Sequence, residues 1–141
     1  MDPQTVNLVQ TSFQKVIPIA DLAMKIFYTK LFEIDPSLQN LFPTGEEQMG
    51  KQRNKLRDML VVAVNSLSKP EVLIPALQNL GRRHVGYGVA AEHYNTVGQA
   101  LIDTLAAGLG DDFTPEVKTA WGEVYGLIAT TMIEAGNEVA A

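Results

Sequence analysis

Apolar residues recur at spacings of three and four along nearly the whole chain, and no segment of useful length alternates with a period of two. Spacings of three and four place apolar side chains on one face of an α-helix, whereas a half-buried strand needs a period of two. The pattern therefore predicts an all-α protein of six or seven helices with short connections. It leaves open whether they form a simple bundle or a crossed packing.

Prolines and capping residues divide the first third of the chain. A first helix is expected over residues 6–16, and Pro18 is suited to the first turn of a second helix over residues 18–34. Asp35 precedes another proline, which is typical of a cap and first turn, so a short third helix is expected over residues 36–44.

The middle of the chain changes from polar to apolar. A polar stretch, residues 46–57, leads into an apolar helix with Leu56, Met59, Leu60 and Ala63 on one face. Ser68 and Glu71 have the spacing of a capping box, which predicts the start of the next helix. Pro75 is expected to break or restart that helix near its beginning. Its apolar stripe has spacings of four, three and four and consists of Leu73, Leu77, Leu80 and His84.

Glycines mark the boundaries of the last two helices. Gly86 and Gly88 predict a corner, a helix follows over residues 90–109, and Gly110 ends it. Thr114, Pro115 and Glu116 then predict the start of the last helix. The expected inner face of that helix consists of Val117, Ala120, Trp121, Val124 and Ile128.

Composition narrows the class of protein. A length of 141 residues with 46% hydrophobic content suits one domain over residues 1–141. The net charge is −5 and the 11 lysines and arginines are scattered, so nucleic-acid binding is not expected. No cysteine is present, which removes disulfides and thiolate metal ligands. Neither a signal peptide nor a membrane span is visible, so a cytoplasmic protein is the expectation.

The two histidines lie in different settings. His84 continues an apolar helical stripe, while His93 lies in the polar run AEHYN. From spacing alone, a histidine on an apolar face is more often a packed core residue than a ligand. No Glu-x-x-His pair recurs on two helices, and no phosphate loop or common catalytic motif is present. The residues alone therefore leave a cofactor site and plain packing both open.

Four motifs occur in a family-like order and spacing: LFPTG, KQRNKL, LGRRHVGYGV and AWGEVYG. Together they resemble bacterial single-domain haemoglobins and the haem domain of flavohaemoglobins, along nearly the whole chain. The resemblance implies a globin fold of six to eight helices around a pocket for haem b. It also implies that His84 is the proximal ligand of the haem iron, that Tyr94 is the tyrosine beside it, and that Phe42 packs on the porphyrin.

The resemblance also implies a distal side with two hydrogen-bond donors, Tyr28 and Gln52. Without it, Tyr28 would be read as a core tyrosine and Gln52 as a solvated residue of a polar turn. O2 bound to ferrous haem gains negative charge, so a donor here favours O2 over neutral CO and predicts slow O2 release. The other implied haem contacts are Leu56 and Val89, with Lys55, Arg82 and Arg83 as candidates for pairing with the haem propionates; as surface charges, these three are more often solvated.

One position departs from the family pattern. A glutamate in the last helix normally polarises the proximal histidine, but its position aligns with Gly136. Glu134 and Glu138 lie two residues away, rotated by about 200° around the helix. Without that carboxylate the imidazole donates less electron density, which favours reversible binding over peroxidase-like O–O cleavage.

Three functions remain in view. The first is an oxygen-binding protein for transport or storage, or a sensor, with NO, CO or sulfide as other ligands. The second is an NO dioxygenase served by a separate reductase, because this chain has no recognisable flavin or nicotinamide domain. The third is an interaction bundle without a cofactor, in which His84 is merely packed. A monomer and a homodimer are both compatible with the sequence.

Overall fold

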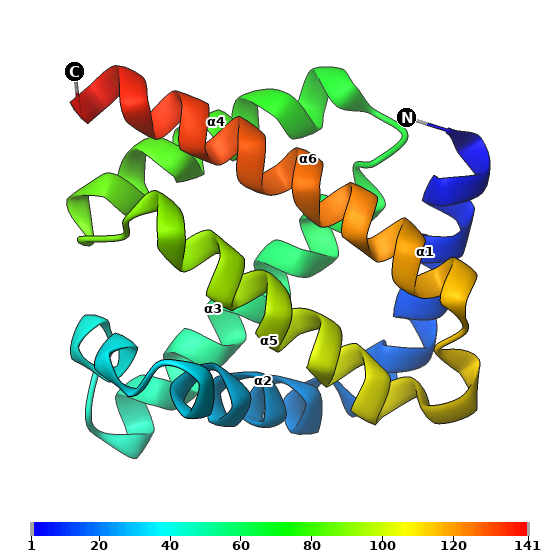
Figure 1. Cartoon of the computed structure of the whole chain (residues 1–141), viewed down its shortest axis with the longest axis horizontal. Helices are drawn as coiled ribbons and strands as arrows, with labels where there is room; N and C mark the ends of the chain where they lie inside the picture. Colours follow the sequence, from blue (N-terminus) through cyan, green and yellow to red (C-terminus); the bar gives the residue numbers. More distant parts are fainter. Residues whose placement is uncertain (1, 141) are drawn as a thin grey trace.

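The computed structural model describes residues 2–140, which form six α-helices and three short 3-10 helices and include no strand (Figure 1). The all-α prediction and the predicted helix number are confirmed. None of the described helices combines the length and the apolar character needed to cross a membrane. In chain order the elements are α1 (Pro3–Val16), η1 (Ile17–Ile19), α2 (Ala20–Ile34), η2 (Pro36–Leu41), α3 (Glu46–Asn65), α4 (Pro70–Gly86), α5 (Ala91–Leu109), η3 (Gly110–Asp112) and α6 (Pro115–Ala140).

The first helix starts earlier than its apolar pattern predicts. The side chain of Asp2 accepts a hydrogen bond from the backbone N–H of Gln4 at 3.0 Å, and Pro3 occupies the first helical position. This cap and proline together start α1 three residues before Val6. Asp35 caps η2 in the same way as predicted, accepting from the backbone N–H of Ser37 at 3.1 Å.

Two predictions about α4 are wrong. The helix begins after Lys69, which has no side-chain cap, so Ser68 and Glu71 do not form a capping box. Pro70 at the first position, with its preset φ, starts the helix instead. Pro75 lies inside α4 and does not interrupt it. Its ring removes the hydrogen bond to the carbonyl of Glu71, and because Glu71 is exposed, water can satisfy that carbonyl.

Two glycines have positive φ, one at the predicted corner and one at the predicted end of a helix. Gly88 has φ of +84° in the connection from α4 to α5, and Gly110 has φ of +56° at the end of α5. Residues with a side chain rarely adopt a positive φ, so glycine is favoured at both positions. The last helix starts as predicted, with the Thr114 hydroxyl accepting from the backbone N–H of Val117 at 3.2 Å.

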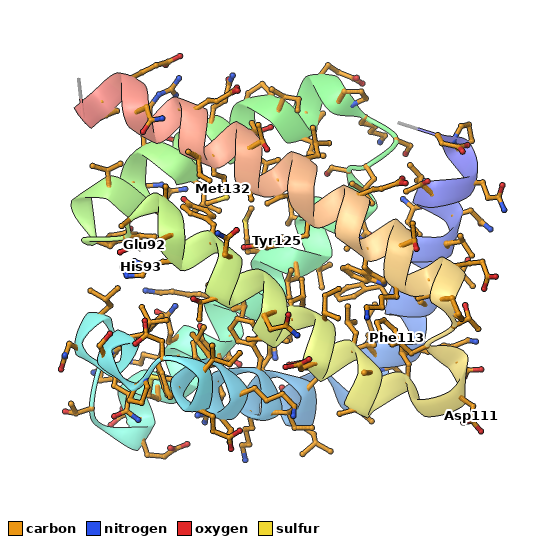
Figure 2. The ribbon with its side chains drawn as sticks, in the orientation of Figure 1. Glu92, His93, Asp111, Phe113, Tyr125 and Met132 are labelled. Carbon is orange, nitrogen blue, oxygen red and sulfur yellow. The ribbon has the colours of Figure 1, made fainter. Side chains whose placement is uncertain are left out.

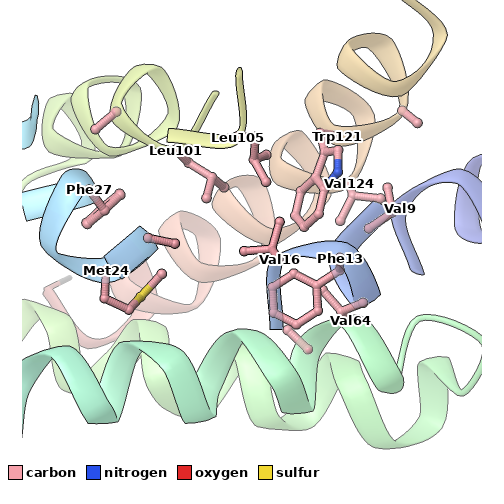
Figure 3. Packing of buried hydrophobic residues seen from close by; sticks show 14 of the residues in the cluster. Val9, Phe13, Val16, Met24, Phe27, Val64, Leu101, Leu105, Trp121 and Val124 are labelled. Carbon is pink, nitrogen blue, oxygen red and sulfur yellow. The ribbon is translucent and has the colours of Figure 1, made fainter. Parts of the chain in front are cut away.

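Side chains from α1, α2, α3, α5 and α6 meet at the centre of the core (Figure 3). The rings of Phe13 and Trp121 lie 6.0 Å apart between their centroids. The indole N–H of Trp121 donates to the Ser12 hydroxyl at 2.9 Å, so this large buried side chain leaves no unpaired donor. The predicted inner face of α6 is buried from Val117 to Val124, and this anchors the helix that crosses over the rest of the fold (Figure 1).

Helices α4 and α6 pack backbone against backbone. A Cβ atom added at Gly81 would overlap the backbone carbonyl of Met132, and one added at Gly136 would lie 3.3 Å from the carbonyl oxygen of Gly81. Only glycine permits this approach. Since His84 lies one turn after Gly81, the contact fixes the distance of His84 from α6.

Gly81→Ala is therefore expected to lower the free energy of unfolding by about 1–3 kcal/mol, because the added methyl group meets backbone that cannot move aside alone. This loss outweighs the gain of about 1 kcal/mol in helix propensity. Urea denaturation followed by circular dichroism measures the change. Gly126→Ala in α6 is the matched control, since a Cβ there meets nothing within 4 Å. Equal stabilisation by both variants would contradict the close contact.

Candidate haem site

Tyr28 and Gln52 meet although they come from different helices. Gln52 in α3 donates a hydrogen bond from Nε2 to the hydroxyl oxygen of Tyr28 in α2 at 3.2 Å. Burial raises the pKa of Tyr28, and this outweighs the opposing effects of the Gln52 hydrogen bond and the Arg53 charge. The hydroxyl therefore stays protonated at neutral pH. Because its oxygen accepts from Gln52, its own hydrogen is free to be donated to a third group.

Aromatic rings surround Tyr28. Phe42, at the end of η2, lies edge-on to Tyr28 with 5.4 Å between ring centroids, and Phe27 lies edge-on at 5.1 Å. The ring of Phe32 packs near both Tyr28 and Phe42, with 6.0 and 5.6 Å between the ring centroids. The structure thus brings three predicted site residues, Tyr28, Phe42 and Gln52, into one cluster. Its apolar walls strengthen any hydrogen bond that the Tyr28 hydroxyl makes.

His84 is half-buried near the end of α4. Its Nδ1 lies 2.8 Å from the carbonyl oxygen of Leu80. A carbonyl can only accept, so Nδ1 carries the hydrogen and Nε2 keeps its lone pair. Burial is the main reason why the pKa of His84 lies below its usual value; the Arg83 charge lowers it further, while the bond to Leu80 raises it. The side chain is thus a neutral imidazole whose Nε2 lone pair is available to coordinate a metal.

Tyr94 lies beside His84, and Tyr125 forms a hydrogen bond to the backbone of Tyr94. The ring of Tyr94 in α5 lies 6.4 Å from that of His84, as the resemblance implies for a neighbouring tyrosine. Tyr125 in α6 donates its hydroxyl hydrogen to the backbone carbonyl of Tyr94 at 2.5 Å, and Figure 2 shows its side chain between α6 and α5. Burial raises the pKa of Tyr125 well above its usual value, so this bond persists at neutral pH. It ties α5 to α6 beside the histidine.

The packing around Gly136 leaves little room for the glutamate that the family pattern has at this position. At Gly136, an added Cβ would lie 2.9 Å from Cγ2 of Val85, the residue after His84. Neither nearby carboxylate takes its place, because Glu134 is exposed and Glu138 pairs with Arg82 at 3.6 Å on the surface. The carbonyl of Leu80 is therefore the partner that orients His84 in the described part of the chain.

The remaining predicted site residues fall into two groups, one partly buried and one exposed. Leu56 in α3 and Val89 after α4 are partly buried and pack against the core, and the backbone N–H of Val89 donates to the carbonyl of His84 at 3.1 Å. Lys55 and Arg83 are exposed, and neither forms an ion pair with another residue of the described range 2–140. His93 accepts from the backbone N–H of Ala90 at 2.9 Å, so it caps α5 at the place labelled in Figure 2.

Sequence reasoning missed the roles of Tyr125, Phe32 and the Leu80 carbonyl. Tyr125 lies four residues after the buried Trp121, and Phe32 four residues after Tyr28, so helical spacing signals that each is packed. Spacing does not reveal their partners. The Leu80 carbonyl could have been inferred, since a histidine in a helix reaches the carbonyl four residues earlier.

These residues fit a haem. A neutral imidazole with a free Nε2 suits an axial iron ligand, and the aromatic and apolar side chains around Phe42 suit a flat macrocycle. Within residues 2–140, no group of three histidine, cysteine or carboxylate side chains gathers to hold a bare metal ion. A cofactor that needs one protein ligand and an apolar pocket therefore matches the chain better than a metal site built from side chains.

Three flavohemoproteins are similar to this chain. The protein of Chromobacterium violaceum is 34% identical over 111 residues, which cover 79% of this chain and 28% of the relative. That of Xylella fastidiosa is 32% identical over 130 residues, 92% of this chain and 32% of the relative. That of Bordetella parapertussis is 30% identical over 133 residues, 94% and 33%. The chain thus spans about a third of the length of these relatives.

A solved structure matches the whole fold. It is an engineered carbene transferase, described as a candidate nitric oxide dioxygenase from Rhodothermus marinus. The TM-score is 0.87 at 28% sequence identity, and the match covers 99% of this chain and 96% of that one. The predicted globin fold is therefore confirmed. The sequence model of the Globin family matches residues 25–132, most of the chain, and with this match and the aligned flavohemoproteins the chain belongs to the globin family.

Proposed function

We propose that this globin, as one domain over residues 1–141, holds one haem b through His84 and reversibly binds O2 on the opposite face. The observation that carries the proposal is the hydrogen bond from Gln52 to the Tyr28 hydroxyl, because it leaves a protonated, oriented donor among apolar rings. A distal hydrogen-bond donor of this kind selects a ligand that becomes negatively charged.

His84 would hold the haem, whose iron would supply the site that binds a diatomic ligand. Tyr28 would donate its O–H to that ligand, while Gln52 donates a hydrogen bond to the phenol oxygen and orients it. A hydrogen bond to a charged acceptor contributes about 1.5–3 kcal/mol, or on the order of a tenfold to hundredfold change in affinity. The rings of Phe27 and Phe42 give this donor an apolar surrounding, which strengthens the hydrogen bond.

On the other side, His84 is oriented by a neutral carbonyl rather than by a carboxylate. Its Nδ1 hydrogen stays on the ring, and the imidazole has little imidazolate character. Strong electron donation to the iron promotes cleavage of an O–O bond, so its absence favours binding and release over peroxidase chemistry.

NO dioxygenation is the second candidate function. The flavohemoprotein relatives and the description of the Rhodothermus marinus protein favour it. Repeated turnover needs a supply of electrons, and the proposal assigns that supply to a reductase acting on this globin domain. The distal donor pair serves either function, because both begin with O2 held at the same place.

The deciding experiment is a visible spectrum of the haem-reconstituted protein, reduced and then exposed to air, followed by additions of NO. An oxygenated spectrum that persists for many minutes is expected. Stoichiometric loss of that spectrum with one NO, without further turnover, supports storage or transport. Sustained NO consumption with a flavin reductase and NADH supports the dioxygenase. A chain that takes up no haem would overturn both functions.

A further inference from the structure

A surface pocket of about 650 Å³ lies where α2, η2 and the start of α3 meet, at the lower left of Figure 1. Its floor is aromatic and apolar and consists of Tyr28, Phe32 and Met49. Its rim is polar and consists of Lys25, Thr29, Glu33, Gln39, Glu46 and Arg53. The pocket therefore leads from solvent to an apolar floor that includes the distal tyrosine.

The floor of this pocket is continuous with the distal cluster. Tyr28 lines the pocket, and its hydroxyl is held by Gln52, which directly precedes the rim residue Arg53 in α3. Phe32 lines the pocket and also contacts Phe42 at 5.6 Å. The pocket and the distal cluster therefore share two side chains, Tyr28 and Phe32.

An ion pair closes part of the rim. A terminal nitrogen of Arg53 lies 2.5 Å from Oε1 of Glu46, one residue at each end of the first two turns of α3. The Arg53 side chain is only 17% exposed, whereas that of Glu46 is 80% exposed. Glu46 thus holds a largely buried guanidinium against the pocket wall from the solvent side. Because the Glu46 carboxylate is largely exposed, water competes for it, and a pair with one solvated partner is weak enough to open and re-form thermally.

We propose that this pocket is an entry route for small neutral ligands to the distal side, and that the Arg53–Glu46 ion pair is its gate. The proposal rests on the haem-binding function argued above. The rim carries two cations, Lys25 and Arg53, and two carboxylates, Glu33 and Glu46, so it attracts neither sign of charge strongly. The apolar floor favours O2, NO or CO over ions.

The first test is the rate at which CO associates with the reduced, haem-loaded protein after flash photolysis. Glu46→Gln removes the charge that holds Arg53 and is expected to raise the rate about two- to fivefold, the factor by which a weak ion pair biases a closed state. Glu47→Gln is the matched control, since Glu47 is the next exposed carboxylate of the same helical turn and does not line the pocket. It is expected to leave the rate unchanged.

Salt provides a second prediction for the same proteins. CO is neutral, so its encounter with the protein is not steered by charge. Screening of the ion pair should therefore raise the wild-type rate with ionic strength, and Glu46→Gln should remove this dependence. A wild-type rate independent of salt, together with no effect of Glu46→Gln, would overturn the gate.

Blocking the mouth tests the route itself. Thr29→Trp places an indole at the rim and is expected to slow CO association several-fold. Leu22→Trp, an exposed position of α2 outside the pocket, is the control for a bulky side chain on that helix. Equal rates for both tryptophan variants and the wild type would overturn the route, whatever Glu46→Gln does.

A readout independent of the iron separates this proposal from the proposed function. In the CO-loaded protein with ¹³C-methyl methionine, dissolved O2 should enhance the relaxation of the Met49 methyl group more than that of the core residues Met24 and Met132. Glu46→Gln should increase the Met49 effect and Thr29→Trp should remove it. Equal enhancement at all three methionines in a protein that binds CO would overturn the route while leaving the haem function intact. Failure to bind haem or CO would instead overturn the proposed function and the route with it.

Discussion

Replacing His84 with glycine is expected to abolish tight haem binding, and millimolar imidazole in the buffer is expected to restore it. His84 has its Nδ1 held by the Leu80 carbonyl and its Nε2 lone pair available, whereas His93 uses Nδ1 to accept the backbone N–H of Ala90. Free imidazole can enter the space left by the side chain and supply the same donor atom. The Soret absorbance and the rate of haem transfer to an acceptor protein measure both effects.

His93→Ala is the matched control for this experiment. His93 caps α5 through Nδ1, so its loss should weaken the start of that helix by about 1 kcal/mol and leave the spectrum unchanged. A His84→Gly protein that holds haem as tightly as the wild type without imidazole would contradict the assignment of the ligand. Loss of haem in both variants would point to unfolding, which circular dichroism detects.

Replacing Tyr28 with phenylalanine is expected to speed O2 release by about tenfold to a hundredfold, the equivalent of losing one hydrogen bond to a charged acceptor. CO release should change much less, because CO gains little charge. The ring and its contacts with Phe42 and Phe27 remain, so the fold is preserved. Stopped-flow displacement of O2 by CO measures the rate.

Because Tyr28 and Gln52 share a hydrogen bond, their coupling can be measured with a double-mutant cycle on the O2 release rate. In Gln52→Leu alone, Tyr28 keeps its donor but loses the group that orients it, so a smaller acceleration is expected. Tyr87→Phe, at an exposed tyrosine beside His84, serves as the control. An unchanged O2 release rate for Tyr28→Phe, in both the parent and the Gln52→Leu background, would exclude Tyr28 as the donor.

The helices were predictable because their signals are local. Gly110 and Thr114 end and start helices at the predicted positions, since a glycine with positive φ and a capping hydroxyl act within a few residues. The same local rules failed at Pro75 and at the Ser68–Glu71 spacing. At Pro75, the carbonyl left without its helical hydrogen bond belongs to the exposed Glu71, so the proline does not break the helix. At the Ser68–Glu71 spacing, Pro70 occupies the first helical position and starts the helix without a capping box.

The site was less predictable because its contacts join distant parts of the chain. Tyr28 and Gln52 are 24 residues apart and Tyr94 and Tyr125 are 31 apart, and neither pair follows from helical spacing. The family resemblance supplied Tyr28, Gln52 and His84, because it carries information about a shared fold. It did not supply Tyr125 or Arg53, whose positions depend on how this particular chain packs.

The close contact between α4 and α6 limits how this protein can evolve toward a different chemistry. A proximal carboxylate at position 136 would require Gly136→Glu, but the first carbon of that side chain already meets Val85 at 2.9 Å. The substitution becomes tolerable only after a smaller residue replaces Val85 and the helices separate slightly near Gly81. The order of the two substitutions therefore matters, because Gly136→Glu made first would lower the free energy of unfolding more than the same substitution made after Val85→Ala.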